Sequence, residues 1–372
     1  MKVLHVLYRL MPSGAEKMLS DAADIFRQNG VESSILVNDT EYGAYADVLR
    51  GRGYRIYKIP YSRFGGHLIE MWKLCRKEKF DAVHIHVIRG FASIAVVSRL
   101  AGVKRIVKTF HGIFESSGKI QTIMQLARRR IASWVGVKFV AISKSVQDNE
   151  LRRFGTKTML IWNFADERVF ALADTMVGHE VRSELKIPFD SFVLLSVGNC
   201  HSEGHMAIKN HSLVIKAIAM LPKEVKEHIV YLHVGAEMEG FPERILAESV
   251  DVSRQIRFLG SRSDVWRLLC SANEFVMTSR REGISISCIE ASLSGRHMIL
   301  TKVPGLVNYE GILPDVSYVD VEKPEELANV IVRRYHAHGV ESGSEIIREA
   351  SLKVFSLQVG ISSLMSIYRG DV

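Results

Sequence analysis

The sequence predicts an α/β protein built from two doubly wound, Rossmann-like domains that face a central cleft. Short apolar runs alternate with segments of helical periodicity along the 372 residues, a pattern typical of parallel sheets whose strands are joined by helices. The alternation weakens between residues 166 and 188, where charged residues gather, and then restarts. A chain of this length also holds enough apolar residues for two cores.

Apolar runs in the first half are predicted to be strands, and segments with helical periodicity are predicted to be helices. The first helix is expected to end at Gly30, because glycine commonly follows the last turn of a helix. The expected strands are residues 1–8, 33–38, 55–59, 81–87, 105–111 and 138–143, and the expected helices are residues 13–29, 65–79 and 90–101.

The second half repeats this layout. Its first run, SFVLLSVG at residues 191–198, is continuously apolar, as a strand buried on both faces should be. Further strands are expected at residues 229–235, 256–260, 274–279 and 297–301, with a helix at residues 210–221. Ligands of doubly wound sheets bind beyond the carboxyl ends of the strands, so the loops after these strands are candidate sites.

Composition favours a soluble protein of a reducing compartment. The four cysteines are scattered and form no C-x-x-C pair, so neither a disulfide framework nor a zinc ribbon is expected. No apolar run reaches the roughly 18 residues of a membrane span. Residues 1–170 hold 28 Lys and Arg against 15 Asp and Glu, whereas residues 171–372 hold 21 against 26. This charge split predicts different partners for the two halves.

Two acids flank a run of small residues in SRREGISISCIEAS, residues 279–292. The chain is expected to turn at Gly283 and to enter a helix near Ser287, so that the N–H groups between them can receive a phosphate. Glu290, one turn into the helix, can accept two hydrogen bonds from a vicinal diol such as a ribose, and Glu282 can accept one from a sugar hydroxyl. The alternative is a solvated loop acid at Glu282 and a surface helix residue at Glu290.

Lys209 and His111 are two further candidates. Lys209 stands at the start of the expected helix 210–221, where a cation opposes the helix dipole, and an anion opposite it would explain that placement. His111 ends an apolar strand, so its side chain can be held at the edge of the cleft. A lone histidine is more often structural than catalytic, and His84 and His86 are interpreted as packing or cleft-lining residues.

Two cofactor classes are disfavoured by spacing. Cys200, His201, His205 and His211 crowd one loop, but they match no standard zinc pattern, so no metal site is predicted. No G-x-G-x-x-G follows the first strand of either half, which disfavours an NAD-dependent oxidoreductase.

Several motifs occur in an order that resembles the retaining GT-B glycosyltransferases of family 4. Glu282 and Glu290 form the E-x7-E motif of that family. The other matching stretches are PSGAEK (12–17), KTFHG (108–112), AISKSVQDNELRRFGTKTMLIWNFADERVF (141–170), RFLGSRSDVWRLLCSANEFVMTSRREG (257–283) and the ending FSLQVGISSLMSIYRG (355–370). The resemblance covers essentially the whole chain.

The resemblance implies a GT-B fold and a domain plan. The expected parts are an N-terminal acceptor-binding domain at residues 1–165, a linker at 166–188, a C-terminal nucleotide-sugar-binding domain at 189–353 and a last helix at 354–372 that crosses back to the N-terminal domain. The implied reaction is transfer of a hexosyl or N-acetylhexosaminyl group, with retained anomeric configuration and no metal cofactor. The donor is a nucleotide-sugar, with a UDP-sugar favoured over GDP-mannose. The acceptor is lipid-linked or a saccharide in the assembly of cell-surface polysaccharide or lipopolysaccharide.

By the same resemblance, each candidate residue receives a role. Glu290 would bind the ribose hydroxyls, Glu282 the donor sugar and Lys209 the diphosphate. His111 would line the sugar pocket, and Gly14 would let the first helix approach the phosphate or the acceptor. The remaining donor-binding candidates are Gly198, Asn199, Arg262 beside the base, and the backbone of Gly283, Ile284, Ser285, Ile286 and Ser287.

One position departs from the family. Asn199 stands where the family usually has an arginine on the diphosphate. The missing cation leaves open a second hypothesis, a catalytically silent GT-B module that binds nucleotide-sugar or partner enzymes. Arg280 or Arg281 could supply the positive charge instead.

Two basic segments of the first half carry aromatic and aliphatic side chains, HLIEMWKLCRKEKF at residues 67–80 and IMQLARRRIASWVGV at residues 123–137. Basic helices of this composition suit an anionic membrane surface, and no nucleic-acid-binding motif is apparent. For each segment alone, the simpler interpretation is an amphipathic helix with solvated cations. Together they predict a cytoplasmic enzyme that lies peripherally on the inner face of the cytoplasmic membrane.

Overall fold

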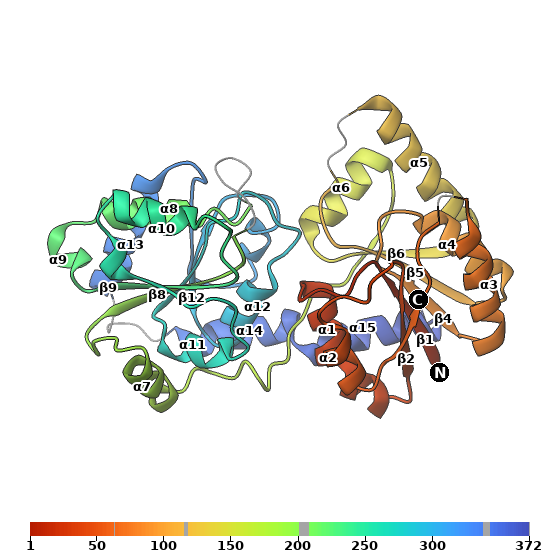
Figure 1. Cartoon of the computed structure of the whole chain (residues 1–372), viewed down its shortest axis with the longest axis horizontal. Helices are drawn as coiled ribbons and strands as arrows, with labels where there is room; N and C mark the ends of the chain where they lie inside the picture. The colour runs from red at the N-terminus through yellow and green to blue at the C-terminus, as the bar shows by residue number, and fades with distance from the viewer. Residues whose placement is uncertain (63, 115–117, 201–207, 338–342, 372) are drawn as a thin grey trace. The chain divides into compact units, whose positions relative to one another are not determined.

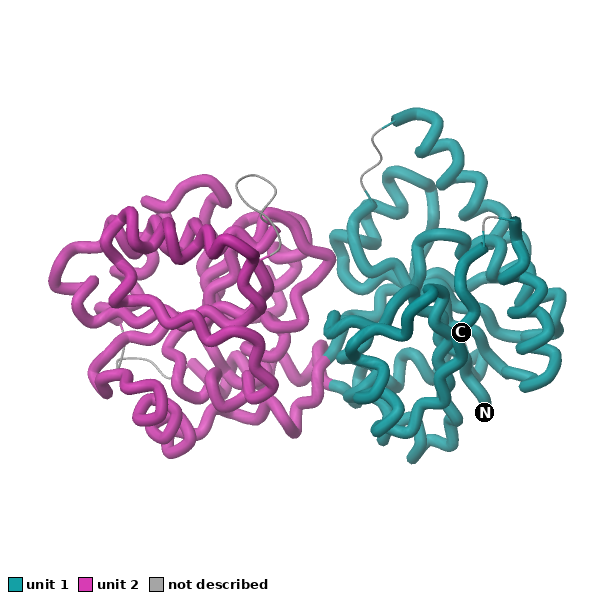
Figure 2. Tube along the Cα trace, in the orientation of Figure 1, with its two compact units in different colours: residues 1–164, 357–372 teal, residues 165–356 magenta. Residues whose placement is uncertain are grey.

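The computed structural model describes residues 1–62, 64–114, 118–200, 208–337 and 343–371. The chain forms two compact units, one of residues 1–164 with 357–372 and one of residues 165–356 (Figure 2). The first is called unit 1 and the second unit 2. The last helix therefore belongs to unit 1, although it follows unit 2 in the sequence.

Residues 166–188, predicted to be a linker, instead lie inside unit 2. They include helix α7 (Thr175–Glu184), which packs against α11 (Val265–Ser271). Asp174 caps α7, because its Oδ1 accepts hydrogen bonds from Met176 N at 2.7 Å and Val177 N at 3.3 Å. The exposed, charged face of this short helix gave the segment the composition of a linker.

Unit 1 contains a seven-stranded parallel sheet in the order β3-β2-β1-β4-β5-β6-β7. Its strands are β1 (Lys2–Leu7), β2 (Glu32–Val37), β3 (Arg55–Lys58), β4 (Ala82–Ile85), β5 (Arg105–Phe110), β6 (Val137–Ala141) and β7 (Met159–Leu160). Its helices are α1 (Gly14–Gln28), α2 (Ala46–Gly51), α3 (Gly66–Glu78), α4 (Phe91–Leu100), α5 (Lys119–Trp134), α6 (Lys144–Phe154) and α15 (Leu357–Arg369).

The helices of unit 1 form two layers. Helix α1 packs against both α2 and α15, whereas α3, α4 and α5 pack in succession (Figure 1). The core between the sheet and α1 includes Phe26, Phe164 and Tyr368, each at most 2% exposed. Gly360 of α15 lies against the Phe164 ring, and a side chain at this position would collide with the ring. Right-handed crossovers explain the two layers, because the strand order reverses direction between β1 and β4.

Unit 2 contains a six-stranded parallel sheet in the order β10-β9-β8-β11-β12-β13. Its strands are β8 (Phe192–Val197), β9 (Ile229–Val234), β10 (Ile256–Phe258), β11 (Glu274–Met277), β12 (His297–Thr301) and β13 (Val316–Val319). Besides α7 and α11, its α-helices are α8 (His211–Ala219), α9 (Lys223–Lys226), α10 (Pro242–Ser249), α12 (Ile286–Leu293), α13 (Pro324–Ala337) and α14 (Ser344–Phe355), with short 3₁₀ turns at Ser253–Gln255 and Val307–Tyr309.

The helices of unit 2 also form two layers. Helix α8 packs against α10 and α13, whereas α12 packs against α14 and α7 against α11. Strands β8, β9 and β12 are buried along nearly their whole length, as their continuous apolar sequences predict. Each strand and helix predicted from the sequence is present. Their ends lie within two residues of the expected ones, except for the last helix, which is Leu357–Arg369 rather than residues 354–372.

Unit 1 buries a lysine, and this burial predicts how the stability of the fold depends on pH. Lys108 is 1% exposed, and its Nζ donates hydrogen bonds to Thr109 O at 2.6 Å and His86 O at 3.2 Å. Burial lowers the pKa of Lys108 from 10.5 to about 7. Between pH 7 and 10.5 the unfolded state therefore binds more protons than the folded state, so stability rises with pH in that window.

We expect Lys108→Met to remove this dependence. Relative to the variant, the wild-type free energy of unfolding should rise by about 1 kcal/mol per pH unit between pH 7 and 9. Urea unfolding of both proteins at pH 6, 7, 8 and 9 measures the difference. A constant difference across this range would show that Lys108 does not change its protonation there.

No helix in the part of the chain that the structure describes has both the length and the apolar character needed to cross a bilayer.

Candidate functional site

Three glycines end neighbouring strands at the carboxyl edge of the unit 2 sheet. Gly198, Gly235 and Gly260 lie after β8, β9 and β10. Gly198 N donates to Val234 O at 2.8 Å, and Gly235 N donates to Gly260 O at 2.9 Å. Gly235 has a φ of 150°, and a side chain there would collide with the Gly198 carbonyl. The glycines let the three strand ends approach closely and hold them in a fixed register.

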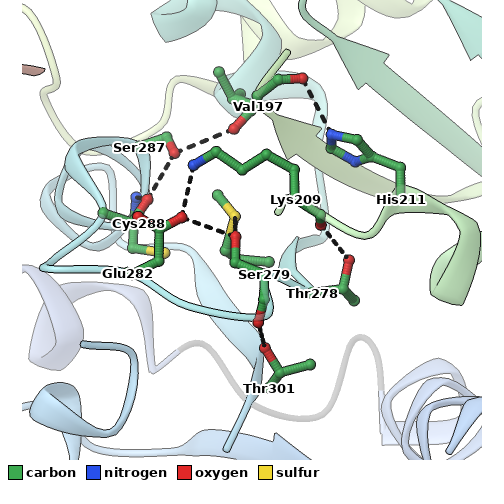
Figure 3. A network of polar contacts seen from close by, with 12 residues as sticks. Val197, Lys209, His211, Thr278, Ser279, Glu282, Ser287, Cys288 and Thr301 are labelled. Atoms are coloured by element: carbon green, nitrogen blue, oxygen red, sulfur yellow. Dashed lines mark hydrogen bonds and ion pairs between the residues drawn. The ribbon is translucent and has the colours of Figure 1, made fainter. Parts of the chain in front are cut away.

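Lys209 and Glu282 form an ion pair beside this edge (Figure 3). Lys209 Nζ lies 2.7 Å from Glu282 Oε1, and the two side chains are 24% and 13% exposed. Ser279 Oγ donates to the same carboxylate oxygen at 2.8 Å. The proposed diphosphate cation and the proposed sugar-binding acid are therefore neighbours, although 73 residues separate them in the sequence.

The structure corrects the reason given for the position of Lys209. Helix α8 begins at His211, and Asn210 before it has a left-handed φ of 52°, so Lys209 does not open the helix. Within the protein, the anion beside Lys209 is the Glu282 carboxylate, and a phosphate partner for Lys209 stays a prediction. Glu282 in turn is a paired, mostly buried acid, so the alternative of a solvated loop acid is wrong.

The backbone around the pair is fixed by hydroxyl groups. Thr278 Oγ1 lies within hydrogen-bond distance of Lys209 O at 3.2 Å and Asn210 O at 3.0 Å, and Thr301 Oγ1 donates to Ser279 O at 2.6 Å (Figure 3). A Cβ at Gly198 would lie 3.1 Å from the Lys209 stem, so glycine leaves room for the lysine there. These contacts hold the ammonium in place before any ligand arrives.

Helix α12 begins at Ile286, close to the predicted start. Ser285 caps it, since its Oγ accepts from Cys288 N at 3.4 Å, and Tyr309 OH donates to Ser285 O at 2.9 Å. The side chains of Ile284 and Ser285 are buried, so a ligand could meet only their backbone. The N–H groups of Ile286 and Ser287 belong to the first turn, where the helix itself offers no acceptor. Helix α12 can therefore present N–H groups and a positive dipole end to an anion.

Glu290 lies one turn into α12 and is 3% exposed. The alternative of a surface helix residue is therefore wrong. Gly283, which precedes the helix, and Glu282 are positioned by the next loop: Gly305 has a φ of 91°, and a side chain there would collide with the Glu282 carbonyl. The segment from Glu282 to Glu290 is thus a packed turn and helix start, as expected for a binding element.

The other proposed donor residues of unit 2 make contacts within the protein. Asn199 Oδ1 accepts from Ala236 N at 2.8 Å, which ties the loops after β8 and β9 together. Arg262 forms a two-pronged pair with Asp264 at 2.8 and 2.7 Å. Arg280 pairs with Glu322 and donates to Asn210 Oδ1 at 3.2 Å. Arg280 is therefore committed to the protein, whereas the side chain of Arg281 is exposed.

In unit 1, His111 is the end of a chain of histidines. His111 Nε2 lies 2.9 Å from His86 Nδ1, and His86 Nε2 lies 3.2 Å from His5 Nδ1. Burial lowers the pKa of His111 to about 3, so the ring is neutral at pH 7. A cavity of about 30 Å³ adjoins these rings and α1. A neutral imidazole fixed by His86 can hydrogen-bond to a hydroxyl but supplies no positive charge.

Gly14, the other candidate of unit 1, is the first residue of α1. Ser13 precedes it in an extended conformation, and its hydroxyl donates to Glu16 rather than capping the helix. The proposed roles of His111 and Gly14 stay predictions.

Sequence reasoning missed several residues that build the site. Ser279, Thr278 and Thr301 act through hydroxyls at strand ends, and such residues carry no distinctive spacing. His233 lies near the end of β9, and its Nε2 and that of His211 both face Gly198 O, at 3.2 and 3.1 Å. The pair of histidines could not be found from sequence, because the two come from different elements. His201 and His205 lie outside the described residues.

Known proteins match both units. The model described as "Glycosyltransferase Family 4" matches residues 12–168, and the model described as "Glycosyl transferases group 1" matches residues 179–335. The chain is 24% identical to the UDP-Gal:alpha-D-GlcNAc-diphosphoundecaprenol alpha-1,3-galactosyltransferase of Escherichia coli, over 81% of this chain and 78% of that protein. It is 24% identical to the putative glycosyltransferase EpsF of Bacillus subtilis (strain 168), over 99% and 96%.

Solved structures share the fold. Anabaena Alr3699/HepE in complex with UDP aligns with a TM-score of 0.82 at 17% identity, covering 99% of each chain. WaaG, a glycosyltransferase involved in lipopolysaccharide biosynthesis, aligns with a TM-score of 0.74 at 15% identity, covering 97% of this chain and 98% of that one. Both units have the parallel sheets of this fold, and each is matched by a glycosyltransferase model, so the chain belongs to the group 1 glycosyltransferases of the GT-B fold.

Proposed function

We propose that this glycosyltransferase transfers a hexosyl or N-acetylhexosaminyl group from a UDP-sugar to a lipid-linked saccharide, with retained anomeric configuration, in the assembly of cell-surface polysaccharide or lipopolysaccharide. The observation that carries the proposal is the Lys209–Glu282 pair beside the start of α12. The names of two matches support the donor and the acceptor. The Escherichia coli relative acts on UDP-Gal and a diphosphoundecaprenol-linked sugar, and Alr3699/HepE was solved with UDP.

The nucleotide is placed on unit 2. The first-turn N–H groups of α12 and the Lys209 ammonium bind the diphosphate, and the positive charge stabilises the departing UDP. Glu290 accepts hydrogen bonds from the two ribose hydroxyls, a strong contact because the carboxylate is charged and buried. Glu282 keeps Lys209 oriented and contacts a hydroxyl of the donor sugar. Arg262 lies after β10 and is assigned to the base.

Lys209 takes the place of a metal ion in this proposal. Asn199 contributes no cation, and Lys209 lies beside Glu282 and the start of α12, so its ammonium is the charge assigned to the leaving group. The transfer step accordingly requires no metal cofactor. In unit 1, His111 is assigned to the sugar pocket as a neutral hydrogen-bonding group.

Calorimetric titration of the purified chain with UDP and with GDP, each without added metal, tests the donor assignment. We expect UDP to bind at least tenfold more tightly than GDP. Preference for GDP would make the donor a GDP-sugar. Binding of neither nucleotide would favour the second candidate, a silent GT-B module, for which the amide of Asn199 in place of an arginine is the supporting observation.

Helix α5 supports an acceptor at a membrane surface. Its exposed apolar side chains recur with helical spacing, so they share one face. They are Ile120, Ile123, Met124, Ile131 and Trp134, with exposed fractions of 77%, 64%, 49%, 46% and 85%. Arg130 lies exposed beside this stripe. An apolar stripe that faces solvent and is edged by cations is typical of a helix that binds in the plane of a membrane.

The structure limits which basic residues of these segments can contact a membrane. Arg129 is 4% exposed and pairs through both Nε and Nη2 with Glu150, at 2.7 Å each, so it cannot meet a membrane. Helix α3 buries Met71 and Cys75, so much of its apolar face serves the core. Of the two predicted segments, α5 is therefore the stronger candidate for contact with the inner face of the cytoplasmic membrane.

We expect Ile123→Ser with Trp134→Ser to weaken binding to anionic vesicles by about tenfold or more, because each change removes apolar area that would leave water. Flotation with vesicles of anionic and of neutral lipid measures the effect. Ile346→Ser is the matched control, since Ile346 is 62% exposed on α14 of unit 2. Equal binding by the double variant and the wild type would exclude this face of α5 as the docking surface.

A further inference from the structure

Three buried side chains of unit 2 converge on one backbone oxygen. Cys200 follows β8, His211 begins α8 and His233 belongs to β9, and they are 6%, 2% and 0% exposed. His211 Nε2 lies 3.1 Å and His233 Nε2 3.2 Å from Gly198 O (Figure 3 includes His211). Cys200 Sγ lies 3.5 Å from His233 Nε2. Two imidazole nitrogens, a sulfur and a carbonyl oxygen thus surround one small volume.

The spacing of these atoms fits a four-coordinate metal ion. Zinc binds nitrogen at about 2.0–2.1 Å, sulfur at about 2.3 Å and oxygen at about 2.0–2.2 Å, so tetrahedral donors lie about 3.3–3.6 Å apart. Three of the six donor separations, at 3.1, 3.2 and 3.5 Å, are close to those values, and the three side-chain ligand atoms all lie within 4.8 Å of one another. We propose that Cys200, His211 and His233, completed by the Gly198 carbonyl, bind a zinc ion with a structural role.

Zinc binding at this site releases one proton. A cysteine thiol carries its proton at neutral pH and binds zinc as the thiolate. The zinc–sulfur bond forms as the thiol proton leaves to solvent, and each imidazole moves its proton from Nε2 to Nδ1. Tyr231 OH lies 3.2 Å from His211 Nδ1 and can donate or accept, so it serves both tautomers.

Charges of both signs lie near the site. The Cys200 thiolate would give the ion one negative charge, and the carboxylate of the buried residue Glu243 also acts on Cys200, whereas the cations Lys209 and Arg244 act on His211 and His233. A second carboxylate, that of Glu237, acts on both Cys200 and His233, although it is paired with Arg244. A borderline-soft ion is favoured over magnesium or calcium because the donors are sulfur and imidazole.

A second group of histidines in the described residues shows that neighbouring histidines alone do not make a zinc site. His5, His84 and His86 of unit 1 also bring ligand atoms within 4.8 Å of one another. The His84 and His86 rings are stacked at 4.1 Å, so their in-plane lone pairs do not converge. Both nitrogens of His84 are already engaged, with Tyr368 OH at 2.5 Å and Thr109 Oγ1 at 2.6 Å. By contrast, the His211 and His233 rings meet edge to face, at 80°.

The zinc ion would hold the Gly198 carbonyl and so restrain the residue that packs against the Lys209 stem. It would stiffen the wall of the nucleotide site without touching the reacting atoms. The test of zinc binding is independent of the proposed transferase reaction, because it requires neither donor nor acceptor.

The test is equilibrium dialysis of the full chain, stripped with a chelator, against ZnCl₂ alone, with metal content measured by mass spectrometry. We expect one zinc per chain, and a loss of affinity of more than about 100-fold in Cys200→Ala and in His233→Leu. Cys75→Ala and His84→Leu are the matched controls, a buried cysteine and a buried histidine outside the site, and should keep one zinc. Circular dichroism confirms which variants are folded.

The visible spectrum of cobalt(II) bound to the wild-type protein tests the site without any substitution that could unfold the chain. We expect the intense visible bands of tetrahedral cobalt and a thiolate charge-transfer band, both displaced by zinc. Calorimetry in buffers of different ionisation enthalpy should find about one proton released per zinc. Absence of zinc binding, an octahedral cobalt spectrum, or zinc affinity unchanged in a folded Cys200→Ala variant would each overturn the proposal.

Discussion

Replacing Glu290 with alanine is expected to weaken UDP binding by about 100- to 10,000-fold. The buried carboxylate would lose two hydrogen bonds from the ribose, each contributing about 1.5–3 kcal/mol because the acceptor is a carboxylate, and about 1.4 kcal/mol corresponds to tenfold in affinity. Isothermal titration without added metal measures the change directly. Glu290 is 3% exposed, so thermal unfolding of the variant must be measured beside the titration.

Two further variants separate a ribose contact from a packing role. Glu290→Gln keeps the shape and one carbonyl acceptor, so it should bind UDP about tenfold more weakly than the wild type. Glu345→Ala removes an exposed acid from α14 and should have no effect. If folded Glu290→Ala bound UDP as tightly as the wild type, the ribose would have to lie elsewhere, and the E-x7-E motif would lose its assigned role.

Replacing Lys209 with methionine is expected to lower kcat by about 100- to 1,000-fold, the usual effect of removing one group that stabilises charge on the departing oxygen. The KM for the donor should rise less, because the charge on the leaving group grows toward the transition state. Steady-state rates with a UDP-sugar donor measure both constants. Lys223→Met on the exposed helix α9 is the control for loss of a lysine as such.

The Lys209–Glu282 ion pair also predicts that Lys209→Met lowers the stability of the fold. Lys209→Met leaves the 13%-exposed Glu282 carboxylate without its ammonium, which should cost about 1–3 kcal/mol after allowing for partial exposure. The double variant Lys209→Met with Glu282→Gln should regain part of that stability while its kcat stays low. Wild-type kcat in folded Lys209→Met would contradict the role of Lys209 in departure of the leaving group.

Much of the fold was predictable because parallel strands buried on both faces leave continuous apolar runs. SFVLLSVG at residues 191–198 became the central strand β8, and the other predicted strands are present. The linker prediction was wrong for a physical reason. Helix α7 buries only a narrow face against α11, so its composition is that of a surface segment. Strand β7 was missed because its two residues carry too little pattern, and the four-residue strand β13 was missed as well.

The site was predictable where one segment carries it. The stretch from Glu282 to Glu290 has a readable turn, cap and helix, and the structure places them as expected. Contacts between distant segments left no such pattern. The pair of Lys209 with Glu282 depends on β11 passing beside the start of α8, and the histidines that face Gly198 come from α8 and β9. The zinc patterns known from sequence assume ligands near one another in the chain, and His233 is not.

The stereochemistry of transfer tests the central claim most directly. The purified chain would be incubated without added metal with an α-linked UDP-sugar and a diphospholipid-linked acceptor sugar, and the product examined by proton NMR as it forms. We expect an α-linked product from the first turnover, formed about 100- to 1,000-fold more slowly by Lys209→Met. A β-linked product would make the enzyme inverting. No product from any UDP-sugar, in a protein that still binds UDP, would contradict the assignment of UDP-sugar transfer.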